Sequence, residues 1–262
     1  MNVMQSFSLE NKSALVTGGA GRYGKQISEA LAEAGALVYI ASRDLARCEE
    51  FAAELRGRGL QAKALQLDLA SEESMQQVMK EIEDDSGGLD ILVNNAVIRC
   101  ALNGWDQTLE AFDRSLHVNA SALFYLTNLA AKQMRQRGGG SIINIGSMMG
   151  LVGIETDNYQ GTDMNPNPSP IYFYEKGGMV NFTRFAASCF GKHNIRVNCI
   201  HPGGLQEDTL PAAFVANYSR RTQLGRLGNQ NDLKGIVVLL ASQASSYITG
   251  TNIPVDGGYT AK

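Results

Sequence analysis

Short apolar runs alternate with longer stretches of helical period along almost the whole chain of 262 residues. The runs SALVT, LVYIA and AKALQLD are each followed by a helical pattern. The first pattern begins at about Gly24, and the next two end at about Arg58 and Asp85. Four further runs, DILVNNA, SIINIGS, IRVNCIHP and TNIPVDGG, have the composition of buried strands. This alternation is typical of βαβ units.

We therefore expect an α/β fold in which residues 1–262 form one doubly wound, Rossmann-type domain, with a seven-stranded, mostly parallel sheet and helices on both faces. A sheet of this kind binds its ligand at the carboxyl ends of the strands, where the strand order reverses. Residues 155–169 (ETDNYQGTDMNPNPS) break the alternation, because they show neither a helical nor a strand period. We interpret them as an inserted loop.

The composition restricts the partners and the compartment. Lys and Arg number 23 against 26 Asp and Glu, so nucleic acid is not an expected partner. No apolar run approaches the roughly 18 residues of a membrane span, and residues 1–13 lack a basic start, so we expect a cytoplasmic protein without a membrane partner. Cys48, Cys100, Cys189 and Cys199 form no CxxC pair and the His residues are scattered, so we expect reduced thiols and no metal site.

A glycine-rich turn follows the first expected strand directly. Gly19, Gly21 and Gly24 satisfy G-x-G-x-x-G at a junction between a strand and a helix. Glycines there allow a pyrophosphate to approach the backbone N–H groups at the helix N-terminus. A turn that binds no ligand is the alternative, but the strand, the turn and the helix all lie where this mechanism requires them.

With this turn, the sequence resembles the short-chain dehydrogenase/reductase family, and the resemblance covers about Leu9 to Tyr259. The family's usual T-G-x-x-x-G-x-G would put Arg22 at the position of the middle glycine, whereas the T-G-x-x-G-x-x-G form of its extended members fits Gly18, Gly21 and Gly24. Other matching landmarks are Asp68 in LQLDL, Asn94-Asn95-Ala96 followed by Val97 in place of the usual glycine, Asn119 in HVNAS, and Pro202-Gly203.

The resemblance implies a nicotinamide cofactor, and it places the following residues around that cofactor: Gly18, Gly19, Gly21, Arg22, Tyr23, Gly24, Ser42, Arg43, Asp68, Leu69, Asn95, Ala96, Tyr172, Lys176, Pro202 and Gly203. Ser42 lies where NAD-preferring relatives tend to carry an acid, and Arg43 lies where NADP-preferring relatives tend to carry a base. An arginine–phosphate contact changes affinity by about 10- to 100-fold. NADP is therefore favoured over NAD, and Asp44 is the competing NAD-type acid.

A candidate pair of reacting groups lies in Tyr172-Phe-Tyr-Glu-Lys176. Reduction of a carbonyl needs a proton donor near neutral pH, and a free phenol with a pKa of about 10 is a poor match. The i to i+4 spacing places Tyr172 and Lys176 on one helix face, where the ammonium can lower the pKa of the phenol. Ser169 is a candidate N-cap and Pro170 suits the first helical position. Tyr174 is expected to point elsewhere.

The resemblance assigns the remaining catalytic roles. Ser147, at the end of SIINIGS, would hydrogen-bond the substrate carbonyl, and Asn119 would hold a proton-relay water. Tyr172 would be the proton donor or acceptor, and Lys176 would modify its pKa and bind the ribose. His193 and His201 are given no role.

These features predict an enzyme that interconverts a carbonyl and a secondary alcohol with NADP(H) or NAD(H). The region from YQGTDMNPNPS to HPGG resembles flagellin- or sugar-modification members of the family, which suggests a sugar-like substrate. A 3-oxoacyl carrier-protein reductase, a sugar-acid dehydrogenase and a non-enzymatic NADP-sensing module are the alternatives.

Residues 155–169 lie between Ser147 and Tyr172, an interval about twice that usual in the family. A loop tethered to two active-site residues is expected near the substrate, and its Asn158, Gln160, Thr162, Asp163 and Asn165 offer polar groups. A surface elaboration is the alternative. The resemblance also implies a homotetramer or homodimer that pairs long helices around residues 111–136 and 170–192.

Overall fold

The computed structural model describes residues 2–100, 104–165 and 169–261. Seven parallel strands form one sheet in the order β3-β2-β1-β4-β5-β6-β7, which confirms the predicted Rossmann-type fold. The strands are β1 (Ser13–Thr17), β2 (Leu37–Ser42), β3 (Ala62–Gln66), β4 (Ile91–Asn94), β5 (Gly140–Ile145), β6 (Ile195–Pro202) and β7 (Asn252–Val255). The α-helices are α1 (Arg22–Glu33), α2 (Leu45–Gly57), α3 (Glu72–Ser86), α4 (Leu109–Leu116), α5 (Ala122–Gln136), α6 (Pro170–Phe190), α7 (Ala212–Arg221) and α8 (Lys234–Ala241).

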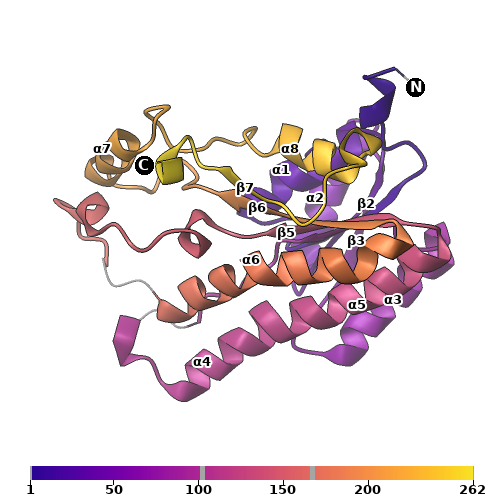
Figure 1. Ribbon diagram of the computed structural model, residues 1–262, viewed down its shortest axis with the longest axis horizontal. Helices are drawn as coiled ribbons and strands as arrows, with labels where there is room; N and C mark the ends of the chain where they lie inside the picture. Colours follow the sequence, from indigo (N-terminus) through magenta and orange to yellow (C-terminus); the bar gives the residue numbers. More distant parts are fainter. Residues whose placement is uncertain (1, 101–103, 166–168, 262) are drawn as a thin grey trace.

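Helices cover both faces of the sheet, with α1, α2 and α8 on one side and α3, α5 and α6 on the other (Figure 1). The alternation of side chains along each strand builds a separate core on each face. In β1, for example, Ala14 and Val16 pack towards α1, whereas Leu15 packs with α3 and α5. Both cores are composed mainly of buried aliphatic side chains, which favours a single register for each strand.

Three elements differ from the sequence-based expectation. Helix α1 begins at Arg22 and not at Gly24, because Gly21 is already its N-cap. The region 109–136 is not one regular helix, since a π-helix, η3 (His117–Ser121), separates α4 from α5. The inserted segment contains a short 3₁₀-helix, η5 (Thr156–Tyr159), and its residues 166–168 lie outside the described part of the chain.

The topology places the expected ligand site at one end of the molecule. The strand order reverses between β1 and β4, so the chain segments that leave these two strands line a shared crevice. Figure 1 shows α7, the segment around η5, the start of α6 and the C-terminus gathered at one end of the molecule. No helix among the described residues is long and apolar enough to cross a bilayer.

Candidate active site

The turn between β1 and α1 has a backbone that only glycines can adopt. Gly18 has a positive φ of 62°, and its N–H donates to the Ala41 carbonyl at 2.7 Å. A Cβ on Gly24 would lie 2.0 Å from the Gly18 carbonyl oxygen, and one on Gly19 would lie 2.8 Å from Ser28 Oγ. No side chain caps the N-terminus of α1, so its first N–H groups remain available to an anion. The turn therefore fits the pyrophosphate of a dinucleotide.

Arg22 and Tyr23, which follow Gly21 at the start of α1, both contact residues outside the turn. The mostly exposed Arg22 pairs with Glu207 at 2.9 Å, so its positive charge already has an acidic partner in this structure. The Tyr23 hydroxyl donates to the Gly203 carbonyl oxygen at 2.7 Å, and burial raises the pKa of this phenol above its usual value. Tyr23 thus joins the turn to the chain that follows Pro202, at the end of β6.

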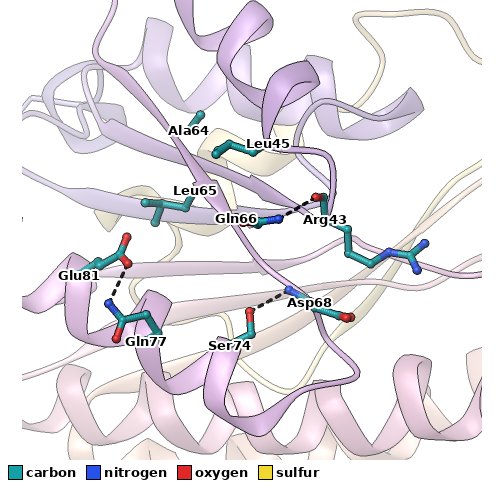
Figure 2. Close-up of a pocket in the computed structure, with 9 residues that line it drawn as sticks. All are labelled: Arg43, Leu45, Ala64, Leu65, Gln66, Asp68, Ser74, Gln77 and Glu81. Carbon is teal, nitrogen blue, oxygen red and sulfur yellow. Dashed lines mark hydrogen bonds between the residues drawn. The ribbon is translucent and has the colours of Figure 1, made fainter.

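The ends of β2 and β3 surround a hollow of about 500 Å³ (Figure 2). The side chains of Arg43 and Asp68 extend to the same side of this hollow, away from Gln77 and Glu81. Arg43 forms no ion pair with a described residue. Asp44 accepts a hydrogen bond from the Arg47 N–H at 3.0 Å and so caps α2.

The remaining residues at this end also have local partners. The Ser42 hydroxyl donates to the Asp44 carbonyl oxygen at 3.1 Å. The Asp68 carboxylate accepts from the Ala70 N–H at 2.9 Å, and Leu69 packs against the core beneath. Arg43 is therefore the cation left open to a phosphate, whereas Asp44 serves as a cap.

Hydrogen bonds tie the end of β4 to the glycine turn. The Asn95 side-chain amide donates to the carbonyl oxygens of Thr17 (2.9 Å) and Gly18 (3.1 Å). The Thr17 hydroxyl in turn accepts from the N–H groups of Asn95 and Ala96, both at 3.0 Å. Val97, which replaces the family's glycine, does not lie in the left-handed region, so the substitution requires no strain.

The candidate reacting groups lie close together beyond the end of β5. Ser147 follows that strand, is buried, and its Oγ accepts from the Met149 N–H at 3.2 Å, which leaves the hydroxyl proton free for another acceptor. Lys176 is also buried, and its Nζ donates to the Ile145 carbonyl oxygen at 2.7 Å. The same Nζ lies 5.8 Å from the centroid of the Tyr172 ring. The structure thus brings the ammonium, the phenol ring and the end of β5 together, as the sequence predicts.

Helix α6 presents Tyr172 and Lys176 on one face and Tyr174 on another. Tyr174 is 67% exposed and its ring lies 6.2 Å from that of Phe112. Pro170 is at the first position of the helix, but the Ser169 side chain makes no capping bond, and its buried Oγ has no hydrogen-bond partner within the described part of the chain. Ser169 therefore occupies the predicted N-cap position of α6, but its side chain does not cap the helix.

Asn119 is buried on the π-helix η3, where its side chain is held from both ends. Its Oδ1 accepts from the Ile98 N–H at 2.9 Å, and its Nδ2 donates to the Ile98 carbonyl oxygen at 2.9 Å. The same Nδ2 lies 3.0 Å from Glu175 Oε2. An inserted helical residue is a frequent feature of functional sites. The proposed relay water at Asn119 stays a prediction.

Sequence reasoning missed a buried carboxyl next to Lys176. Glu175 is 7% exposed, and its Oε1 accepts from the Ser115 hydroxyl at 2.7 Å. Burial raises the pKa of this carboxyl above its usual value, although its bonds to Ser115 and Asn119 and the charge of Lys176 oppose the change. A charged residue on a helix is normally solvent-exposed, so the sequence carried no signal for this site.

Two further residues near the site were missed. His201, fully buried at the end of β6, has Nδ1 2.9 Å from the Ser147 carbonyl oxygen and Nε2 2.8 Å from Asn252 Oδ1, so it positions the Ser147 backbone. The Arg99 guanidinium carbon lies 5.1 Å from the centroid of the Tyr172 ring. His201 could have been suspected from its place at the end of a strand, where ligands bind.

No cluster of His, Cys, Asp and Glu residues suited to a metal ion occurs among the residues described. The donor set of the crevice, which consists of backbone N–H groups, a free arginine, an ammonium and hydroxyl groups, instead suits a dinucleotide phosphate and ribose.

Comparison with known proteins agrees with this geometry. Residues 22–260 match the family model described as "Enoyl-(Acyl carrier protein) reductase". A 3-oxoacyl-[acyl-carrier-protein] reductase of Aquifex aeolicus is 32% identical, over 95% of this chain and 98% of that protein. A short-chain type dehydrogenase/reductase from Mycobacterium marinum has a crystal structure with a TM-score of 0.88 and 33% identity, over 100% of both chains.

A gluconate 5-dehydrogenase from Burkholderia cenocepacia, crystallised with NADP and tartrate, has a TM-score of 0.87 and 28% identity, over 100% of both chains. The names of two of these relatives give different substrates, a 3-oxoacyl-[acyl-carrier-protein] and gluconate. The chain therefore belongs to the short-chain dehydrogenase/reductase family, as an NAD(P)-dependent oxidoreductase that acts on CH–OH groups.

Proposed function

We propose that this enzyme interconverts a carbonyl and a secondary alcohol of a sugar-like substrate, with NADP(H) as the favoured cofactor and Tyr172 as the proton donor and acceptor. One observation carries the proposal: the Tyr172 hydroxyl has no hydrogen-bond partner among the described residues, while the Lys176 ammonium lies 5.8 Å from its ring centroid. A phenol that is free to reach the substrate and lies beside a fixed cation is suited to proton transfer.

When bound, NADP(H) supplies or accepts the hydride. In the direction of reduction, the Tyr172 hydroxyl gives its proton to the carbonyl oxygen as negative charge develops there. The Ser147 hydroxyl donates a hydrogen bond to the same oxygen, because its oxygen accepts from the Met149 N–H and its proton has no acceptor among the described residues. In the direction of oxidation, the Tyr172 phenolate oxygen accepts the proton of the alcohol, and the Lys176 ammonium stabilises that phenolate by its charge.

The preference for NADP is supported by the groups around the hollow beside β3. Arg43 is free of ion pairs with described residues, so its guanidinium can bind a 2′-phosphate in two parallel hydrogen bonds. Asp44, the only acid in Ser42-Arg43-Asp44, already accepts a bond from the Arg47 N–H. The related gluconate 5-dehydrogenase structure contains NADP.

A sugar-like substrate is supported by the segment 155–169 and by the same relative, a dehydrogenase of the polyhydroxylated compound gluconate. Asn158 is 2% exposed, and its Oδ1 has no hydrogen-bond partner among the described residues. Gln160 and Thr162 bond within the segment, to Asp157 and Tyr159, so they offer fewer free groups than their sequence suggests. The four cysteines are free thiols, which is consistent with a reducing compartment, and we propose a cytoplasmic location.

The experiment is a fluorescence titration of the purified protein with NADPH and with NADH, followed by a panel of sugars, sugar acids and oxoacyl thioesters with the preferred cofactor. We expect tighter binding of NADPH and turnover of a sugar or sugar acid. Tighter binding of NADH would contradict the cofactor assignment. Turnover confined to the thioesters would contradict the substrate class and favour a 3-oxoacyl carrier-protein reductase.

A further inference from the structure

The residues on either side of Arg99 are held by contacts with other parts of the chain, and the Arg99 side chain lies next to Tyr172. The preceding residue, Ile98, has both of its backbone polar groups bonded to the Asn119 side chain, at 2.9 Å each. The Sγ atom of Cys100, which follows Arg99, lies 3.6 Å from the Ala111 carbonyl oxygen. From this anchored stretch the Arg99 side chain reaches Tyr172, and its guanidinium carbon lies 5.1 Å from the ring centroid.

The positive charge of Arg99 has no acidic partner among the described residues. Two of the three acids of the inserted segment are already paired, because Arg221 binds Glu155 at 2.6 Å and Asp157 at 3.2 Å. The third acid, Asp163, forms no ion pair with Arg99. The charge of Arg99 also acts on Tyr159 of η5, where it opposes the increase in pKa that burial causes. Arg99 therefore lies between the reacting residue of α6 and the inserted segment, with its charge unneutralised.

We propose that Arg99 binds a carboxylate of the substrate, so that the enzyme acts on hydroxy acids and the matching keto acids in preference to neutral polyols. The proposal rests on the carbonyl–alcohol interconversion at Tyr172 described above. A guanidinium presents a planar fork of donors that matches the two oxygens of a carboxylate. Because the fork lies over Tyr172, the carboxylate is held close to the carbon that loses or gains the hydride.

Arg99 could instead act only on Tyr172, by stabilising the phenolate through its charge. The two roles predict different kinetics. A carboxylate-binding residue changes the Michaelis constant of acids and leaves neutral substrates unaffected, whereas a residue that acts through Tyr172 changes kcat for both kinds of substrate equally. Substrate pairs that differ only in the carboxylate therefore separate them.

The test compares the wild type with Arg99→Gln and Arg99→Lys in oxidation of aldonic acids and of the matching neutral alditols by NADP⁺. Arg114→Gln, which removes one exposed positive charge from α4, is the control for net charge. Arg99→Gln is expected to raise KM for the acids by about 10- to 100-fold and to leave the alditols unchanged. Arg99→Lys should recover part of this loss, and Arg114→Gln should resemble the wild type.

Binding of malonate to the NADP⁺ complex, measured by calorimetry, provides a readout that does not depend on turnover. We expect binding to the wild type and to Arg114→Gln, and binding weakened at least about 10-fold in Arg99→Gln. Equal losses for acids and alditols, or malonate binding that is unaffected by Arg99→Gln, would overturn the carboxylate site. If the wild type oxidises alditols as efficiently as the matching acids, and Tyr172 is needed for both, the proposed function stands and only the carboxylate site is wrong. If malonate binds through Arg99 but no alcohol is oxidised, the proposed function fails instead.

Discussion

Glu175 keeps a carboxylate in a buried position although a neutral side chain could make similar hydrogen bonds. It accepts from Ser115 and Asn119, at 2.7 and 3.0 Å, and burial raises the pKa of its carboxyl. A raised folded-state pKa means that the contribution to stability is complete below the unfolded pKa of about 4.3 and is lost as pH rises through the folded value. At neutral pH the charged form of Glu175 therefore opposes folding.

Glu175→Gln should accordingly have a higher Tm than the wild type near pH 7.5, because the amide can accept from Asn119 and donate to Ser115 without a charge. The difference should shrink as pH falls through the range in which the wild-type carboxyl becomes protonated. Thermal unfolding followed by circular dichroism from pH 4.5 to 8 measures this. A variant that is less stable than the wild type at pH 7.5 would show that the ionised hydrogen bonds outweigh the cost of burial.

We propose that the preference for NADP over NAD depends on Arg43. Its guanidinium lies at the edge of the hollow beside β3 and forms no ion pair with a described residue. Arg43→Ala should weaken NADPH by about 10- to 100-fold and leave NADH nearly unchanged, since only NADPH carries the 2′-phosphate. Equilibrium binding of both cofactors to the wild type and the variant gives the answer. Equal weakening of the two cofactors would show that Arg43 does not read the phosphate.

The sequence predicts a residue's role well when its partner is close along the chain. Tyr172 and Lys176 share a helix, so their i to i+4 spacing was sufficient to predict that the two side chains lie close together. The partners of Glu175 lie on other elements, because Ser115 belongs to α4 and Asn119 to η3. The partner of Arg99 is Tyr172, which is far from it along the chain. Such pairs depend on how α4, η3 and the β4 loop pack, which no local pattern describes.

At the scale of elements, strands were easier to predict than helix details. The residues of β6, Ile195–Pro202, form the strand over the whole run that the apolar pattern indicated. The π-helix η3 could not be predicted, because a local apolar pattern does not distinguish it from an α-helix; its Asn119 is bonded to Ile98, which lies far from it along the chain. Tertiary hydrogen bonds overrode a regular local pattern there.

The inserted segment makes its contacts with α7 and the C-terminal end of the chain. Arg221 pairs with Glu155 and Asp157, and the Asn158 side chain donates to the Tyr259 hydroxyl at 2.8 Å. Tyr159 packs against Phe214, with ring centroids 5.5 Å apart. We propose that this assembly is a wall of the substrate pocket.

Replacement of residues 156–165 with a short glycine-containing turn should therefore raise KM for the substrate at least about 10-fold or abolish turnover, while NADPH affinity stays nearly constant. The physical reason is that the segment packs on α7, whereas the phosphate turn lies between β1 and α1. Steady-state kinetics with a parallel cofactor titration measure both effects. A folded deletion variant with unchanged kinetics would identify the segment as a surface elaboration.

At the scale of the whole molecule, the outer side of the α4–α6 layer carries exposed aromatic side chains. Phe124 of α5 is 57% exposed and Phe185 of α6 is 63% exposed. Large exposed apolar residues of this kind often mark a protein interface. We propose that a second copy of the chain covers them, in a homodimer or homotetramer.

Phe185→Glu combined with Phe124→Glu should shift the protein to a smaller species in size-exclusion chromatography with light scattering, because a buried charge has no partner in an apolar interface. The circular dichroism spectrum should be unchanged. The exposed residue Leu45 of α2, changed to Glu, is the control on the opposite face. A wild type that elutes as a monomer at micromolar concentration would rule out the assembly.

For the enzyme as a whole, we propose hydride transfer with Tyr172 as the proton donor and acceptor. The most direct measurement is substrate-dependent NADPH oxidation by the wild type, Tyr172→Phe and Tyr174→Phe, each with its NADPH affinity determined beforehand. Tyr172→Phe keeps the ring but loses the hydroxyl, so we expect kcat to fall by about 10²- to 10⁴-fold with cofactor binding nearly unchanged, and Tyr174→Phe to remain close to the wild type. Equal losses in the two variants, or full activity in Tyr172→Phe, would contradict the assignment.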